Sequence, residues 1–376
     1  MSFLLNEEQQ MIEDALGRVL RQLWQHTTLA DPAAAQAMQR TLWQQLAELG
    51  LLGAFLPERL GGSDGGPVET MIVARAFGQH LVRLPVLAQQ VMCGAILAHH
   101  SDQWPSGFDA QSLGSGGLRM ALAAHERERR YDVDRPATQA RPTDAGYRLD
   151  GSKHFVCDGA DAEWLIVSAR LDDGLGLFLV PAGTAGLQIE GYPSVEGSAL
   201  ATVHLRDVQV TAAARLCGQA DAGRILGQAI TQAAFWAAAE TLGGCEAAMQ
   251  QTLAYLQVRE QFGRRLASFQ ALQHRASDLH ADLEMLRSQV LGASLSLIAD
   301  PMGASARADV AAAACLAADT GDRICREAIQ MHGAIGMTRD LGIGRYLMRV
   351  NFLWRLLGDP HWQQQRLLNH GLEMLS

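Results

Sequence analysis

The chain has 376 residues, about two to three times the length of a common single domain, which excludes one small core. Apolar residues make up 48% and charged residues only 19%, against roughly 25% in soluble chains, so we expect part of the surface to be buried between subunits. The net charge of −9 repels polyphosphates and anionic lipids. This charge predicts that neither nucleic acid nor a membrane is a partner.

The cysteines and the N-terminus favour a reducing compartment. The six cysteines are scattered and contain no CxxC pair, which argues against both a disulfide framework and a zinc site. The first ten residues lack a basic segment followed by an apolar run, and no later stretch offers the roughly 18 apolar residues of a membrane span. We therefore expect a cytoplasmic protein without a metal site.

Helical spacing predicts a first domain over residues 1–117. The apolar residues Met11, Leu16, Val19 and Leu20 follow helical spacing. Glycine, serine and aspartate then replace the apolar pattern between Ser101 and Gly117, which marks a domain boundary.

Short apolar runs separated by Gly, Asp and Pro predict a β-domain over residues 118–214. Val203, Leu205, Val208 and Val210 nearly alternate with polar residues, which indicates a half-exposed strand. The run WLIVSA is almost continuously apolar, which indicates a strand buried on both faces. A compact sandwich or small barrel is the expected arrangement.

Residues 215–376 return to a helical pattern. Apolar side chains recur every three or four positions along one seam, at Phe269, Leu272, Ala276, Leu279, Leu283, Leu286 and Val290. Such a seam packs a long helix into a bundle. Helical, β and helical domains in this order predict an α+β protein.

Two motifs in the third domain resemble segments of the acyl-CoA dehydrogenase family. One is REQFG from Arg259, followed by FQALQH from Phe269, and the other is QMHGAIGMT from Gln330. The resemblance spans about Glu7–Leu368 and implies an N-terminal helical domain, a central β-sandwich or barrel and a C-terminal four-helix bundle. It also implies an FAD-dependent oxidoreductase of fatty acid metabolism that dehydrogenates an acyl-CoA thioester.

Within the family, the segment GPVETM from Gly66 and the pair Gly358-Asp359 look like the small subunit of pimeloyl-CoA dehydrogenase. The resemblance implies an oligomer, either a homo-oligomer such as a tetramer or a heterotetramer with a larger homologous subunit. Electron-transfer flavoprotein is the implied electron acceptor. A dicarboxylic acyl-CoA is the implied substrate, while branched, aromatic and steroid acyl-CoAs remain open.

The resemblance also implies which residues bind FAD. A pyrophosphate needs fixed donors and an adenine needs a flat apolar surface, and in the family an Arg and a Phe reach across a subunit interface to supply them. The implied contacts in the third domain fall on Arg259, Phe262, Gln270, Gln330, Gly333 and Ala334. In the alternative interpretation Arg259 is a surface ion-pair residue and Phe262 belongs to the core.

The β-domain departs from the family where the flavin ring is expected. The segment HERERRYD from His125 stands in place of a T-E-P-x-A-G-S-D pattern. Phe155 replaces a Trp, and Cys157 replaces a Thr hydroxyl near flavin N5; because a thiol donates hydrogen bonds weakly, the potential of a bound flavin would differ. His125 either replaces the lost hydroxyl contact or forms an ion pair with a neighbouring acidic residue.

The general base of the family is missing at both places where it is expected. Removal of the α-proton needs a positioned carboxylate, but counting about nine residues beyond Arg349 arrives at Gly358, and a second lineage's position falls on Ala233. Glu240 lies two turns further along the same helix, about 10 Å away by helix rise.

Asp359 is then the candidate base of this chain, with His361 as a further candidate. The alternative role of Asp359 is to cap a helix that begins at Pro360. Three functions follow: a dehydrogenase subunit whose partner supplies the base, a structural subunit that completes a partner's FAD site, or a flavin monooxygenase or nitroalkane oxidase-like enzyme.

Overall fold

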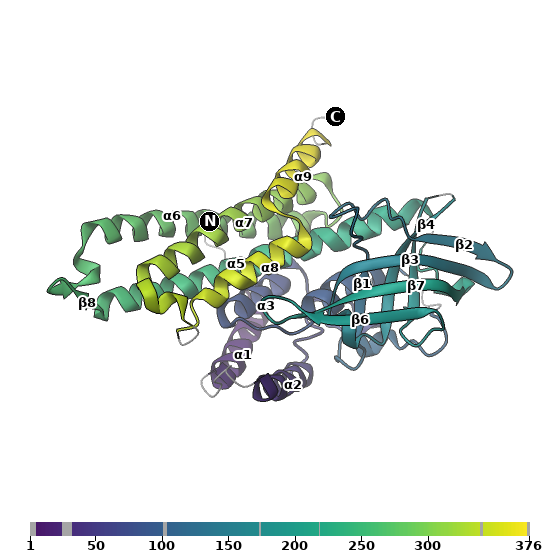
Figure 1. Ribbon diagram of the computed structural model, residues 1–376, viewed down its shortest axis with the longest axis horizontal. Coiled ribbons are helices and arrows are strands. Elements are labelled where there is room, and N and C mark those ends of the chain that lie inside the picture. Colours follow the sequence, from purple (N-terminus) through teal and green to yellow (C-terminus); the bar gives the residue numbers. More distant parts are fainter. Residues whose placement is uncertain are drawn as a thin grey trace. The chain divides into compact units, whose positions relative to one another are not determined.

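A computed structural model describes residues 5–24, 32–100, 104–172, 174–217, 219–338 and 341–373. Helices, strands and again helices follow one another along these residues (Figure 1), which confirms the predicted α+β class. The chain forms two compact units: a bundle unit of Met1–Thr27, Pro67–Arg83 and Ala234–Ser376, and a sheet unit of Thr28–Gly66 and Leu84–Ala233. None of the helices in the described ranges combines the length and apolarity needed to cross a membrane.

The bundle unit consists of long helices whose apolar faces pack together. They are α1 (Glu7–Trp24), α3 (Pro67–His80), the C-terminal part of α5 (Gln219–Val258), α6 (Gln270–Ala299), α7 (Ala304–His332), α8 (Gly344–Leu357) and α9 (Pro360–Glu373). The predicted seam of α6 is confirmed from Leu279 to Val290, where its members are buried. Its first members, Leu272 and Ala276, are only half-buried, so the start of α6 extends beyond the tightly packed part of the bundle.

Two glycines let α3 and α5 cross with their backbones in contact. A Cβ on Gly78 would lie 1.8 Å from the carbonyl oxygen of Glu240, and one on Gly243 would lie 1.9 Å from that of Arg75. No side chain fits at such distances, so the crossing requires glycine at both positions.

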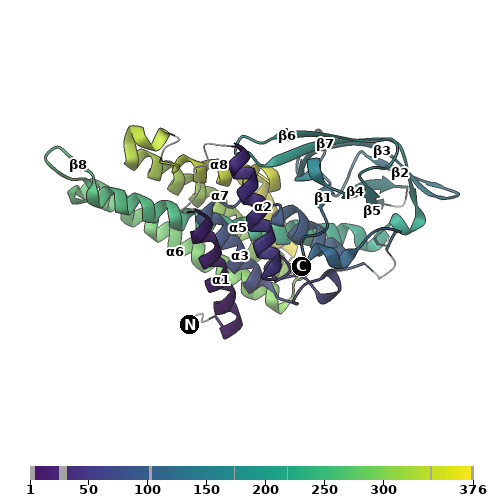
Figure 2. The ribbon, with the colours of Figure 1, turned by 90° about the horizontal axis from the view of Figure 1, so that it is seen from below.

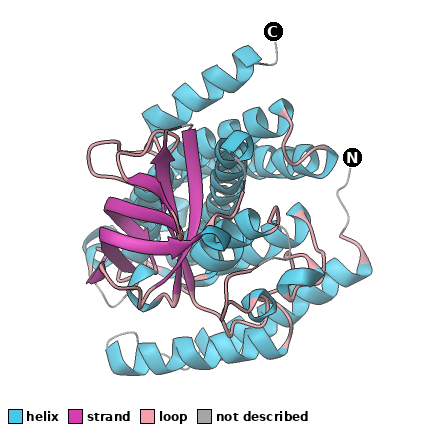
Figure 3. Cartoon of the chain, turned by 90° about the vertical axis from the view of Figure 1, so that its right-hand side faces the viewer, coloured by secondary structure: helices cyan, strands magenta, loops and turns pink. Residues whose placement is uncertain are grey.

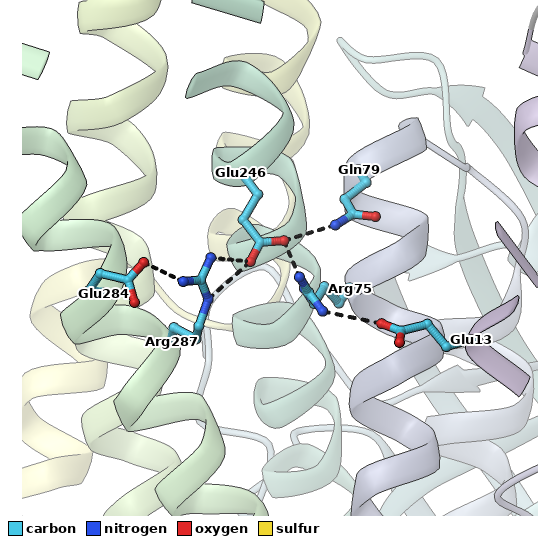
Figure 4. A network of polar contacts seen from close by, with 6 residues as sticks. All are labelled: Glu13, Arg75, Gln79, Glu246, Glu284 and Arg287. Atoms are coloured by element: carbon cyan, nitrogen blue, oxygen red, sulfur yellow. Dashed lines mark hydrogen bonds and ion pairs between the residues drawn. The ribbon is translucent and has the colours of Figure 1, made fainter. Parts of the chain in front are cut away.

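A network of charged groups holds this crossing and joins four helices (Figure 4). The carboxylate of Glu246 on α5 accepts hydrogen bonds from Arg75 Nε at 2.7 Å and Gln79 Nε2 at 2.9 Å on α3, and from Arg287 Nη2 at 2.8 Å on α6. Arg75 also pairs with Glu13 on α1 at 3.4 Å. Burial alone would raise the pKa of Glu246, but the hydrogen bond and charge of Arg75 and the hydrogen bonds of Arg287 and Gln79 lower it.

The sheet unit contains the seven-stranded sheet of the described residues (Figure 3). Its strands are β1 (Met120–Ala123), β2 (Gln139–Thr143), β3 (Gly146–Cys157), β4 (Trp164–Leu171), β5 (Gly174–Pro181), β6 (Leu187–Pro193) and β7 (Ala199–Thr211). The strand order is β1-β4-β2-β3-β7-β6, with β5 also paired to β4. As expected from its apolar run, β4 is buried on both faces apart from Arg170. The unit also holds α2 (Pro32–Glu48) and α4 (Gly94–Leu97).

A bulge in β3 shapes the surface of the sheet. The register with β7 passes from Lys153 opposite Val203 to Val156 opposite Ala201, so β3 carries one extra residue there. Phe155 lies in this bulge with a φ of 53° and is 55% exposed. An aromatic ring is therefore presented to the outside of the sheet at the cost of a left-handed backbone conformation.

Candidate functional site

The first motif forms a projecting hairpin between α5 and α6. Strands β8 (Glu260–Gln261) and β9 (Arg264–Arg265) pair across a two-residue loop, Phe262-Gly263, whose φ values are 53° and 75°. Positive φ at both loop positions is what the tightest hairpin turns require. In Figures 1 and 2 the hairpin lies at the outer end of these two helices. Phe262 is 89% exposed, so the interpretation of Phe262 as a core residue is wrong.

The hairpin surface combines positive charge with flat apolar rings. The guanidinium of Arg264 lies 3.9 Å from the centre of the Phe269 ring, which in turn contacts Phe262 edge to face at 6.2 Å. Arg259 is exposed at the start of the hairpin, and its backbone N–H and C=O pair with Tyr255 and Leu266. Arginines recognise pyrophosphates and exposed aromatic rings stack on bases, so the hairpin suits a planar anionic group.

A stacked pair of rings brings the second motif beside the hairpin. Tyr255, one turn before Arg259 on α5, stacks on His332 at the end of α7 with ring centres 4.5 Å apart, and its hydroxyl donates to the His332 carbonyl at 3.4 Å. Gly333 follows with a φ of 67° and no atom within 4 Å of a would-be Cβ. The turn therefore leaves room for a ligand close to the backbone.

The remaining predicted contacts of this unit are on the surface. Gln330, in the last turn of α7, and Ala334, directly after Gly333, are exposed, as is Gln270 at the start of α6. The structure thus groups the two motifs of the bundle unit at one end of their helices.

His125, Phe155 and Cys157 belong to the sheet unit, and the first two lie on neighbouring segments. The N–H of His154 donates to the carbonyl of His125 at 2.9 Å, so His125 and the Phe155 bulge are adjacent. Burial, assisted by the positive charge of Lys153, lowers the pKa of His125 to about 4, so its ring is neutral at physiological pH. The buried thiol of Cys157 donates to Asp158 Oδ2 at 3.3 Å.

A buried ion pair supports this part of the sheet. Lys153 Nζ donates to Glu126 Oε1 at 2.8 Å and to Ser168 Oγ at 3.0 Å, and both charged side chains are more than nine-tenths buried. Burial opposes charge on Glu126, but Lys153 and Thr138 lower the pKa of its carboxyl to about 2. Burial lowers the pKa of Lys153 to about 8 although Glu126 raises it. The cation paired with Glu126 is therefore Lys153.

The candidate bases are engaged in structural contacts. Asp359 Oδ1 accepts the backbone N–H of Trp362 at 2.9 Å, so Asp359 caps α9, as the alternative role predicted. Glu240 is buried, and its carboxylate accepts hydrogen bonds from Arg349 Nε at 2.5 Å and Trp236 Nε1 at 2.7 Å. His361 is exposed on α9 with its ring 3.3 Å from the Gln365 amide.

Comparison with known proteins agrees with this architecture. Models for the N-terminal, middle and C-terminal domains of acyl-CoA dehydrogenase match residues 6–104, 121–208 and 223–359. Acyl-CoA dehydrogenase FadE27 of Mycobacterium tuberculosis is 30% identical over 340 residues, which cover 88% of each chain. The chain belongs to the acyl-CoA dehydrogenase family.

Two solved structures of the family share the fold over nearly the whole length. A chain of the ChsE4-ChsE5 complex from Mycobacterium tuberculosis is 29% identical with a TM-score of 0.86, and 99% of each chain is covered. A variant of the Tcur3481-Tcur3483 steroid ACAD is 28% identical with a TM-score of 0.84, covering 98% of this chain and 99% of the other. The domain order predicted from the motifs is therefore the observed one.

Sequence reasoning did not anticipate the pairing of Lys153 with Glu126 or the stacking of Tyr255 on His332. A signal for the first exists, because Lys153 is the one lysine among 31 basic residues and lies two positions after Gly151 inside a strand-forming segment. An isolated lysine where every other long cation is arginine indicates a specific environment. The Tyr255 contact joins residues 77 positions apart and leaves no local signal.

Proposed function

We propose that the chain is an FAD-binding subunit of a heteromeric acyl-CoA dehydrogenase, in which a homologous partner supplies the catalytic carboxylate. The observation that carries this proposal is the state of the candidate bases. Glycine and alanine occupy the two positions implied for the base, Asp359 caps a helix and Glu240 is bound by Arg349. A related complex of two named components, ChsE4-ChsE5, supports assembly with a second chain.

The residues of this chain suit FAD, which, when bound, supplies the acceptor for the hydride that leaves the β-carbon. Arg259 and Phe262 would hold the pyrophosphate and the adenine of the partner's cofactor. Gly333 and Ala334 would approach a pyrophosphate with their backbone, and Gln270 and Gln330 would border it. The arrangement of exposed cations, exposed ring and open glycine supports these roles.

The sheet unit would contact the ring of the flavin bound by this chain. Phe155 presents an exposed ring on its bulge, and the neutral His125 can donate or accept a hydrogen bond without adding charge. Cys157 would offer only a weak donor. Electrons would then pass to electron-transfer flavoprotein, as the family resemblance implies.

An anaerobic titration with acyl-CoA tests the proposal through the visible absorbance of the flavin. The purified chain is expected to hold FAD without bleaching, and its complex with a base-carrying homologue is expected to bleach. Pimeloyl-CoA and a steroid acyl-CoA are the first substrates to try, the second because a relative is a steroid ACAD. Rapid bleaching by the chain alone would refute the dependence on a partner.

A second candidate is a structural subunit that binds no FAD of its own and only completes the partner's site. The projecting hairpin favours it, since the exposed ring of Phe262 is available for contact with another molecule. FAD content separates the two candidates: one FAD per chain in the complex supports the first, and one FAD per pair of chains supports the second.

Matched variants test the hairpin in either case. Arg259→Ala is expected to weaken FAD retention by the complex about tenfold or more, because a charge-assisted contact is worth about 1.5–3 kcal/mol. Arg326→Ala, at an exposed arginine that pairs with Asp322 one turn away on α7, is the control and should leave FAD retention unchanged.

A further inference from the structure

The corner between α8 and α9 has no space for a side chain at position 358. Gly358 has a φ of 121°, a conformation that side-chain-bearing residues rarely adopt. A Cβ at this position would lie 2.3 Å from Cδ1 and 3.2 Å from Cγ of Trp362, and 2.9 Å from Nε2 of Gln363. The indole of Trp362 therefore fills the space in which a side chain would begin.

Hydrogen bonds hold the end of α8 and the start of α9 together at this corner. Gln363 is fully buried, and its Nε2 donates to the carbonyl oxygens of Leu357 at 2.9 Å and Gly358 at 3.5 Å. Asp359 Oδ1 accepts the N–H of Trp362. The end of α8 is thus capped by a side chain of α9, and the start of α9 by Asp359, which fixes Trp362 against Gly358.

We propose that Trp362 leaves no room for any side chain at position 358. The corner itself therefore excludes a base at this position, and one substitution at position 358 does not create a working base. The proposal deepens the proposed function, because position 358 is the place where the family resemblance puts the base. Trp362 acts as a positioning residue that determines which chain of an assembly can carry the carboxylate.

A double-mutant cycle in the full-length protein tests the closure. Gly358→Ala is expected to lower the unfolding midpoint strongly, and Trp362→Ala moderately. The double variant should lose clearly less than the sum of the two, because removal of the indole relieves the clash. Gly342→Ala is the control: Gly342 also has a positive φ, 71°, but no atom lies within 4 Å of its would-be Cβ, so this variant should lose much less than Gly358→Ala.

The functional part is tested with Gly358→Glu. This variant is expected to unfold at a lower midpoint than wild type and to show no bleaching by acyl-CoA, and Trp362→Ala in the same chain is expected to restore part of the midpoint. A Gly358→Glu protein as stable as wild type, or additive losses in the cycle, would overturn the closure. Bleaching by Gly358→Glu alone would overturn its consequence for catalysis. If the wild-type chain and its complexes hold no FAD, the proposed function fails. The closure at position 358 still stands in that case, provided that the losses in the double-mutant cycle are less than additive.

Discussion

Removal of the ammonium of Lys153 should destabilise the sheet unit more than any change on its surface. Lys153→Met keeps the length and most of the volume of the side chain but leaves Glu126 charged and buried. That carboxylate retains three hydrogen bonds, from Ala137 N, Thr138 N and Thr138 Oγ1. Breaking a buried ion pair costs about 3–5 kcal/mol. Because Glu126 keeps these three hydrogen bonds, we expect the free energy of unfolding to fall by about 3 kcal/mol, the lower end of this range.

Urea unfolding of wild type and Lys153→Met measures this loss. Addition of Glu126→Gln to Lys153→Met removes the uncompensated charge and should recover part of the stability. Arg170→Met, an exposed cation on the adjacent strand β4, is the control and should change the free energy of unfolding by less than about 0.5 kcal/mol. A loss below about 1 kcal/mol for Lys153→Met would refute the claim that this pair is a main support of the sheet.

The same pair gives a pH dependence with a defined sign. The pKa of Glu126 is lowered from 4.5 to about 2 in the folded protein, so its contribution to stability is present above pH 4.5 and is lost as the pH falls toward 2. In Lys153→Met the pKa of Glu126 should rise toward 4.5, so this acid loss of stability should become smaller than in wild type. Since Lys153 is the only lysine, NMR of lysine labelled with ¹⁵N at the side chain reads its pKa, expected near 8, from one signal.

Three further changes test other parts of the molecule. Glu246→Gln should lower the free energy of unfolding by only about 1–3 kcal/mol, because the two arginines that Glu246 binds are partly exposed. Since the pKa of Glu246 is lowered, the stability difference between wild type and this variant in urea unfolding should shrink as the pH falls below about 4.5. Gly78→Ala should destabilise by about 1–3 kcal/mol or more through the α3–α5 crossing, whereas Gly292→Ala, with no atom within 4 Å, should be neutral or slightly stabilising in thermal unfolding. Cys157→Thr introduces the hydroxyl that the family resemblance implies at this position and should shift the reduction potential of the bound flavin, measured by dye equilibration. Cys93→Ser, distant in sequence, should leave this potential unchanged.

The fold could be predicted because its signals are local and periodic. The seam from Leu279 to Val290 and the apolar run of β4 occur in the structure as the pattern indicated. Strand β2 was not predicted, because its sequence QARPT has no alternating apolar residues and is held by pairing with β3. Strand β3 continues through Gly151, because pairing with β7 overrides the local break that a glycine favours.

The candidate site could be predicted only where a motif fixes it. The REQFG segment indicated an exposed ligand contact, and Phe262 is exposed. The closure at Gly358 could not be predicted, because it depends on a left-handed backbone angle and on the position of the Trp362 indole, neither of which follows from composition or spacing. The contact of Glu240 with Arg349 likewise joins residues 109 positions apart.

We propose that this chain carries no base of its own for the α-proton of an acyl-CoA. Exchange of that proton with deuterium oxide, followed by mass spectrometry of the recovered acyl-CoA, measures the base without relying on the colour of the flavin. We expect no exchange above the uncatalysed rate with the FAD-loaded chain alone, and exchange when the base-carrying partner is present. Exchange catalysed by the isolated chain, abolished by Asp359→Asn, would contradict it.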